Sequence, residues 1–271
     1  MTINLKESNG VPQIMLGLQG APCTGKTWAA STFPNPTIVD FDRGTTALCG
    51  RDIKVVPFYD AVFVKEKFKA PTKQYTIEGI PTTVLNRRDA FRKWLDTDAA
   101  NMKAGETLVI DSWTSLMNAF DLMTEAEPAY TKQGNVDEFA FWRRKIMWST
   151  DVIEMLKSLS CNVVVCFHEI QQRDKATGIL LDKVQPLMEG KFVAELKVHF
   201  TDYYRQCAIP KVKLDGKPSD VNGKAIDKDG WYWQVKSDAA FDAKCRVPNV
   251  VDKFVPAHYS FFEKAYSTTN K

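Results

Sequence analysis

The chain has 271 residues, of which 44% are hydrophobic and 25% charged, and its formal net charge is +3. This composition is ordinary for globular proteins and allows a sizeable core, while the net charge alone indicates no nucleic-acid partner. The six cysteines are scattered without a C-x-x-C pair, which argues against a zinc site and favours reduced thiols and a cytoplasmic protein. The first ten residues lack an apolar signal segment, and no run approaches ~18 apolar residues, so we expect no membrane span.

Nearly continuous apolar runs of strand length recur along the chain, at residues 13–19, 37–41, 54–58, 107–111 and 162–167. Such runs are typical of parallel strands that are buried on both faces. Helical patterns lie between them, at residues 25–33, 87–95 and 137–159. The alternation predicts a doubly wound α/β fold. We expect a single domain over residues 1–271, with a core of about residues 12–209 and C-terminal strands and an arm over about 210–271.

The composition changes after the last of these apolar runs. Residues 171–191 contain Gly, Pro and many charges, which predicts a mobile loop or a hairpin. Residues 201–209 and 231–237 predict strands that extend the sheet with antiparallel pairing. The segment between them, 210–230, is rich in turn residues and basic, and 259–266 predicts a short helix or arm.

A phosphate-binding pattern stands near the start of the chain. The stretch GLQGAPCTGKTWAA contains G-x-x-x-x-G-K-T at Gly20, Gly25, Lys26 and Thr27. The glycines let the backbone expose N–H groups to phosphate oxygens, the lysine reaches the β and γ phosphates, and the threonine hydroxyl suits Mg²⁺. An apolar strand leads in and a helical pattern leads out, which argues against a chance turn. The predicted nucleotide contacts are Gly20, Ala21, Pro22, Cys23, Thr24, Gly25, Lys26, Thr27 and Trp28.

Acidic residues end two of the other predicted strands. In TLVIDSW, Asp111 is placed to hold Mg²⁺ together with Thr27, although it could instead only cap the following helix. Ser112 follows it, so the catalytic base must lie elsewhere. In TIVDFDRG, Asp40 and Asp42 stand at the carboxyl end of a strand, where a carboxylate can polarise the attacking water. The alternative is two carboxylates in a solvated turn.

The order of these motifs resembles the RecA-like ATPase core over about residues 12–250. More narrowly, it is similar to the phage-encoded RecA-like ATPases associated with single-strand annealing, the group sometimes called Sak-four. The resemblance implies a RecA-like P-loop NTPase with a mainly parallel central sheet flanked by helices and an antiparallel C-terminal extension. Asp42 matches the place of the family's catalytic glutamate, one methylene shorter.

Two further elements take their roles from the same resemblance. His168 ends a buried strand, where the family carries a sensor of nucleotide state, and the alternative is a satisfied core histidine. The segment after it becomes the candidate DNA-contact loop, with the alternative of a solvated charged loop. Its candidate phosphate-contacting cations are Arg173, Lys175, Lys183 and Lys191, beside Gln171 and Gln172. The loop contains no aromatic residue, so it carries no signal for base stacking.

Two cation-rich stretches remain. Lys244 and Arg246 form a K-x-R pair of the kind that RecA-like ATPases project into a neighbouring subunit's nucleotide, or they are two surface cations. Residues 139–148 mix aromatics with Arg143, Arg144 and Lys145. Helical spacing favours a core helix with these three cations on its solvent side over a nucleic-acid patch.

The resemblance implies a Mg²⁺-dependent, DNA-stimulated ATPase that forms a ring or filament on single-stranded DNA. It would work in phage recombination, replication or repair in the host cytoplasm, with a single-strand DNA-binding protein as a further candidate partner. An alternative is an ATP-gated annealing or loader module with little turnover. A small-molecule phosphotransferase is a third class, although no strong Arg-rich lid is found. The guanine signature N-K-x-D is missing, which favours ATP over GTP.

Overall fold

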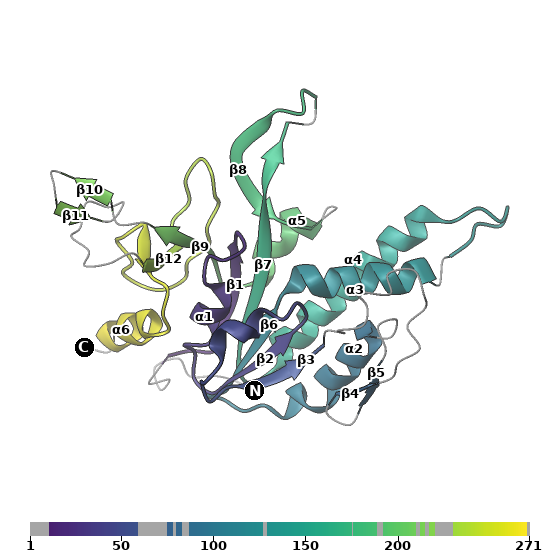
Figure 1. Ribbon diagram of the computed structural model, residues 1–271, viewed down its shortest axis with the longest axis horizontal. Helices are drawn as coiled ribbons and strands as arrows, with labels where there is room; N and C mark the ends of the chain where they lie inside the picture. Colours follow the sequence, from purple (N-terminus) through teal and green to yellow (C-terminus); the bar gives the residue numbers. More distant parts are fainter. Residues whose placement is uncertain are drawn as a thin grey trace.

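The computed structural model describes residues 11–58, 75–77, 80–82, 87–126, 129–174, 176–188, 192–209, 212–214, 217–219 and 230–269. Within these residues, a nine-stranded sheet forms the centre and helices cover both of its faces (Figure 1). Across the sheet the strands lie in the order β13 (Phe254–Pro256), β12 (Gly230–Gln234), β9 (Asp202–Ile209), β1 (Met15–Gly20), β7 (Asn162–Arg173), β6 (Thr107–Asp111), β2 (Pro36–Asp40) and β3 (Lys54–Pro57), and β8 (Leu180–Pro186) pairs with β7. Two small ribbons pair β4 (Tyr75–Ile77) with β5 (Ile80–Thr82) and β10 (Val212–Leu214) with β11 (Lys217–Ser219).

Helices pack on the sheet in two layers. The α-helices are α1 (Lys26–Ala30), α2 (Arg87–Thr97), α3 (Trp113–Ala126), α4 (Glu138–Ser158), α5 (Phe192–Glu195) and α6 (Ser260–Thr269). The 3₁₀ turns are η1 (Gly44–Leu48), η2 (Ala99–Asn101) and η3 (Leu196–His199). One face of the sheet packs against α1 and α6, and the other against α2, α3 and α4. Among the described residues, no helix has both the length and the apolar character needed to cross a membrane.

The predicted parallel core is confirmed. β1 pairs in parallel with β7 and β9, and β6 and β2 continue the parallel order out to β3. The register sets Gly20 opposite His168 and Asp40 opposite Asp111. Because parallel strands end at the same edge, the polar residues that close these strands meet along one line.

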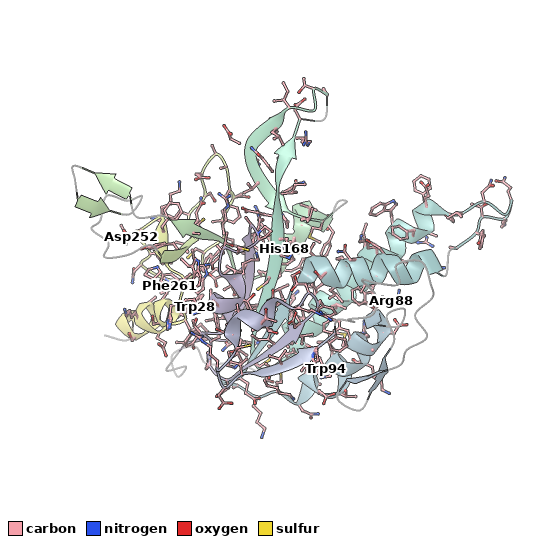
Figure 2. All side chains as sticks on the ribbon, in the orientation of Figure 1. Trp28, Arg88, Trp94, His168, Asp252 and Phe261 are labelled. Carbon is pink, nitrogen blue, oxygen red and sulfur yellow. The ribbon has the colours of Figure 1, made fainter. Side chains whose placement is uncertain are left out.

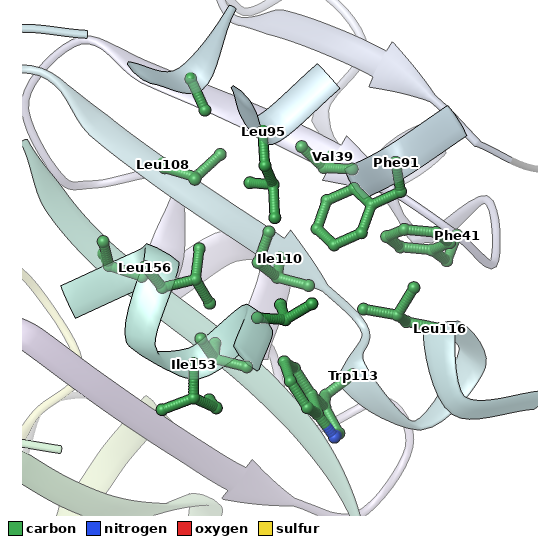
Figure 3. Packing of buried hydrophobic residues seen from close by; sticks show 14 of the residues in the cluster. Val39, Phe41, Phe91, Leu95, Leu108, Ile110, Trp113, Leu116, Ile153 and Leu156 are labelled. Carbon is green, nitrogen blue, oxygen red and sulfur yellow. The ribbon is translucent and has the colours of Figure 1, made fainter. Parts of the chain in front are cut away.

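Alternate residues of the strands build the larger core cluster. Val39, Leu108 and Ile110 point to the face where Phe91 of α2 and Ile153 of α4 pack, and all five are fully buried (Figure 3). Each of these strands is buried on its other face as well, which is why the sequence shows continuous apolar runs rather than alternation.

Two expectations for the C-terminal half are refined by the strand pairing. Strand β9 is parallel to β1 and antiparallel to β12, so the antiparallel part of the sheet begins one strand later than expected. The segment after His168 is a hairpin rather than a loop, because β7 continues to Arg173 and β8 returns antiparallel beside it. Figure 1 shows this β7–β8 hairpin projecting away from the body of the molecule.

The interpretation of residues 139–148 is correct for the helix and wrong for some of its side chains. Lys145 is buried, and its Nζ lies 2.8 Å from Asp121 Oδ1 of α3. Conversely, Phe139 is 90% exposed and Met147 is 62% exposed. The first turns of α4 extend beyond the sheet (Figure 1). The apolar face that the helical period predicts therefore does not pack against the core in these turns.

Candidate active site

The phosphate loop connects β1 to α1 and has the backbone that its glycines predict. Gly25 lies at φ 82°, in the left-handed region. Lys26 is only 6% exposed, and its Nζ donates to the carbonyl oxygens of Gly20 at 2.9 Å and Ala21 at 2.8 Å. The ammonium group therefore lies within the loop, bonded to neutral acceptors. A phosphate oxygen is a charged and hence stronger acceptor, which would compete for this lysine.

Thr27 and Asp111 meet across the end of the sheet. The Thr27 hydroxyl donates to Asp111 Oδ2 at 2.6 Å. Burial, together with repulsion from Asp42 and Asp40, raises the pKa of Asp111 from 3.8 to about 6, against the opposing effects of Thr27 and Lys26. A buried carboxylate that is costly to ionise and lies beside a hydroxyl suits a divalent cation, which would neutralise its charge.

Gly44 lies at the centre of this group of side chains. A Cβ placed on it would come within 3.1 Å of both Asp111 Oδ2 and Asp42 Oδ1, and within 3.4 Å of Thr27 Oγ1. The absence of a side chain at this position keeps open the space that the three oxygens share. An oxygen-lined space of this kind fits Mg²⁺, which prefers hard oxygen ligands.

Asp42 stands beside this space with three side-chain partners. Its Oδ2 accepts from Ser112 Oγ at 3.2 Å and Ser115 Oγ at 3.4 Å, and lies 3.2 Å from His168 Nε2. Partial burial alone would raise the pKa of Asp42, but the His168 contact and hydrogen bonds from Gly44 and Ser112 outweigh it and lower the pKa below 3.8. Asp42 is therefore ionised at neutral pH and is held in a defined orientation.

Asp40 has a different role from its neighbour, which sequence reasoning did not separate. It is fully buried, and its Oδ1 accepts from the backbone N–H groups of Asp42, Arg43 and Gly44. Its Oδ2 accepts from the Thr45 backbone and hydroxyl. Asp40 thus organises the turn that carries Asp42. The signal for this role is the run of turn residues D-R-G-T just after it, since Asp bonds the backbone of such turns.

His168 lies where β7 leaves the body of the sheet (Figure 2). Its backbone N–H donates to Thr114 Oγ1 at 3.2 Å, and its Nε2 faces Asp42. The other ring nitrogen, Nδ1, is buried and has no hydrogen-bond partner within the part of the chain that the structure describes. The residue therefore contacts the carboxylate beside the phosphate loop and is not a core histidine with both ring nitrogens satisfied.

A partly buried ion pair next to His168 was missed by sequence reasoning. Glu169 is paired with Arg205 of β9 through two contacts of 2.9 Å, and the Glu169 side chain is 8% exposed. Gln19 donates to Glu169 at 3.3 Å and accepts from Tyr203 at 2.9 Å. This network ties the base of the hairpin to β1 and β9. No local pattern signals it, because its members lie on three separate strands.

The K-x-R pair lies at the amino-terminal ends of β9 and β1, at the sheet edge opposite the phosphate loop of the same chain. Lys244 Nζ donates to the carbonyl oxygens of Lys197 at 3.1 Å, Val198 at 3.3 Å and Phe200 at 2.6 Å. Burial and the nearby Arg246 charge lower the pKa of Lys244 below 10.5. The lysine thus caps η3, while the Arg246 side chain lines a shallow pocket.

The predicted DNA contacts fall on the β7–β8 hairpin and just beyond it. Arg173 lies at the end of β7, where it donates to Gly178 O at 3.3 Å, and Lys183 is exposed on β8. Lys175 and Lys191 lie outside the described residues. The hairpin also carries apolar side chains at its surface, with Ile179 65% exposed. Its surface is therefore mixed rather than simply basic.

A family model described as an AAA domain matches residues 13–247. The crystal structure of the RadB recombinase is similar with a TM-score of 0.38 and 15% identity, over 83% of this chain and 89% of that one. The crystal structure of flagellar accessory protein FlaH from Methanocaldococcus jannaschii is similar with a TM-score of 0.33 and 11% identity, over 87% of this chain and 92% of that one. No curated protein gave a significant match. The phosphate loop of this chain joins a central strand of a mostly parallel sheet to a helix, as in a P-loop NTPase fold. The family model spans most of the chain, so the chain belongs to the AAA domain family.

Proposed function

We propose that the protein binds and hydrolyses ATP and uses the nucleotide to control its hold on single-stranded DNA. The observation that carries the proposal is the convergence of Lys26, Thr27, Asp111, Asp42 and His168 at one edge of the sheet. Lys26 would bind phosphate, and Thr27 and Asp111 would bind Mg²⁺. Asp42 would act as the base, and His168 lies beside it.

The binding roles follow from the contacts of each residue. The N–H groups of the loop from Gly20 to Thr27 and the Lys26 ammonium hold the phosphates. Thr27 and Asp111 would hold Mg²⁺, which supplies positive charge against the phosphoryl oxygens when bound. Burial raises the pKa of Asp111, so its ionised form is costly without a cation; a bound Mg²⁺ would displace the proton and neutralise the carboxylate charge.

Asp42 is the proposed general base. Its lowered pKa leaves it ionised at neutral pH, ready to accept a proton from the attacking water. Ser112 and Ser115 hold one carboxylate oxygen, so its orientation is set before the water arrives. Asp40 fixes the backbone below it.

His168 is the proposed link to DNA. It contacts Asp42 and lies on β7, which runs on without a break into the projecting hairpin. A change at the phosphate site that moves Asp42 would therefore reach the hairpin through one strand. Arg173 and Lys183, with Lys175 and Lys191, are the proposed phosphate-contacting cations.

A shared active site is the proposed reason for assembly. Arg246 lies at the sheet edge opposite its own phosphate loop, so it could meet a nucleotide only in a neighbouring subunit. Lys244 is proposed to join it there, although this would require the lysine to leave the carbonyl oxygens that it now caps. A homo-oligomeric ring or filament would satisfy this geometry.

The finer biological setting rests on motif order. The resemblance to the phage Sak-four group supports a role in phage recombination, replication or repair in the host cytoplasm, with a single-strand DNA-binding protein as a further partner. A second function, nucleotide-gated DNA annealing or loading with little turnover, is favoured by one observation. Asp42 stands where a longer glutamate would reach further toward the phosphate.

Steady-state ATP hydrolysis with and without saturating single-stranded DNA tests the proposal. We expect the DNA to raise turnover and Lys26→Ala to abolish it, whereas the matched change Lys132→Ala, at an exposed loop lysine, leaves turnover unchanged. If saturating DNA neither binds nor raises turnover, the proposed DNA function is wrong. If the wild-type protein hardly hydrolyses ATP even with saturating DNA, while its DNA binding still requires ATP, the gated module replaces the ATPase.

A further inference from the structure

An exposed tryptophan lies directly against the phosphate loop. A Cβ placed on Gly25 would come within 2.5 Å of Trp231 Cδ2 and 2.6 Å of Cε2. The indole ring therefore covers the loop at its second glycine, in space that any larger residue would fill. Trp231 is nevertheless 39% exposed, whereas Trp233, two residues further along the same strand, is fully buried.

Two other rings extend this surface. Trp28 follows Thr27 in the chain, and its ring centroid lies 5.0 Å from that of Trp231 and 6.2 Å from that of His258. The Arg51 guanidinium lies 5.5 Å from the Trp28 centroid. Figure 2 shows Trp28 at the side of the sheet where α1 and the C-terminal segment meet. Three rings from distant parts of the chain thus gather beside the phosphate loop.

The Trp231 backbone is held firmly in place. It pairs with Ala208 of β9, and its carbonyl oxygen accepts from the Ala257 N–H at 3.0 Å. A ring on a strand fixed at both sides is preorganised for contact, unlike a ring on a free loop.

A nucleotide whose phosphates contact Lys26 and Thr27 must place its base close to the loop, because the ribose that joins the base to the phosphates is short. An aromatic base gains most from contact with the face of another ring, and the Trp231 ring, 39% exposed, lies beside the loop. We propose that Trp231, supported by Trp28, is the surface on which the nucleobase stacks. This inference rests on the proposed function, since it assumes that the phosphate loop binds a nucleotide.

Isothermal titration calorimetry with two probes separates the base from the phosphates. One probe is Mg²⁺-ADP, and the other is Mg²⁺-tripolyphosphate, which has no base. Two variants fill similar space at the same position, since Trp231→Phe keeps an aromatic face and Trp231→Leu removes it. The control is Phe139→Ala, which changes a ring on α4 that is 90% exposed.

We expect Trp231→Leu to weaken ADP binding by about tenfold and Trp231→Phe by no more than about twofold, with tripolyphosphate unaffected in both. Equal ADP affinity in the wild type and Trp231→Leu would overturn the inference. So would an equal loss for both probes, because the ring would then support the loop rather than the base. If neither probe binds the wild-type protein, the proposed function itself fails, and the inference fails with it.

Discussion

Replacing Asp111 by Asn removes a carboxylate whose ionisation the fold opposes. The side chain is buried, with a pKa of about 6 in place of the ordinary 3.8. Between these two pH values the folded protein binds a proton that the unfolded chain has already released. Stability of the ligand-free protein therefore falls as pH rises through this range, and the loss is complete above about pH 6.

The size of this effect follows from the same two values. The gap between 3.8 and about 6 corresponds to about 3 kcal/mol at pH 8, of which about half is already present at pH 5. Asn cannot ionise and can still accept from the Thr27 hydroxyl. The advantage of Asp111→Asn over the wild type should thus grow by about 1–2 kcal/mol between pH 5 and pH 8. For a protein of this size that is a Tm difference of about 3–6 °C.

Thermal unfolding without Mg²⁺ or nucleotide, at pH 5, 6, 7 and 8, measures this difference. The matched control is Asp40→Asn, which should destabilise at every pH because Asp40 accepts five hydrogen bonds that an amide cannot all replace. A Tm difference between Asp111→Asn and wild type that does not change with pH would refute the reasoning. ATP turnover by Asp111→Asn should be lost, because the variant lacks the carboxylate that would hold Mg²⁺.

Three further predictions concern the other site residues. Asp42→Asn should lower turnover by about a hundredfold or more while calorimetry shows unchanged ATP affinity, because only the base is lost. Joint replacement of Arg173 and Lys183 by Ala should weaken single-stranded DNA binding and reduce its salt dependence, measured as the slope of log affinity against log salt concentration. An unchanged slope would show that the DNA does not contact these two cations. Lys244→Ala should lower the free energy of unfolding by about 1–3 kcal/mol, because three carbonyl oxygens lose a charged donor. Arg246→Ala should leave the free energy of unfolding unchanged and lower only the ATP turnover of the assembled protein. Equal stability losses in these two variants would contradict the distinction drawn between them.

Features that a few neighbouring residues encode can be predicted from the sequence. The phosphate loop is recognisable because its backbone requires glycine at Gly25 and its chemistry requires Lys26 and Thr27. The parallel strands are recognisable because burial on both faces leaves continuous apolar runs such as residues 107–111 and 162–167. These patterns are local, so no tertiary contact is needed to see them.

Which distant residues act together becomes visible in the folded structure. Asp40 and Asp42 look alike in sequence, but one accepts backbone N–H groups below the turn and the other faces His168. In sequence, Lys244 belongs to a K-x-R pair, but in the structure its ammonium group caps three carbonyl oxygens. Trp231 reads as an ordinary strand residue in sequence, but its ring covers Gly25. The physical reason is strand register. It brings together side chains that lie far apart in the chain, such as Asp42 and His168, and no short stretch of sequence relates such residues to each other.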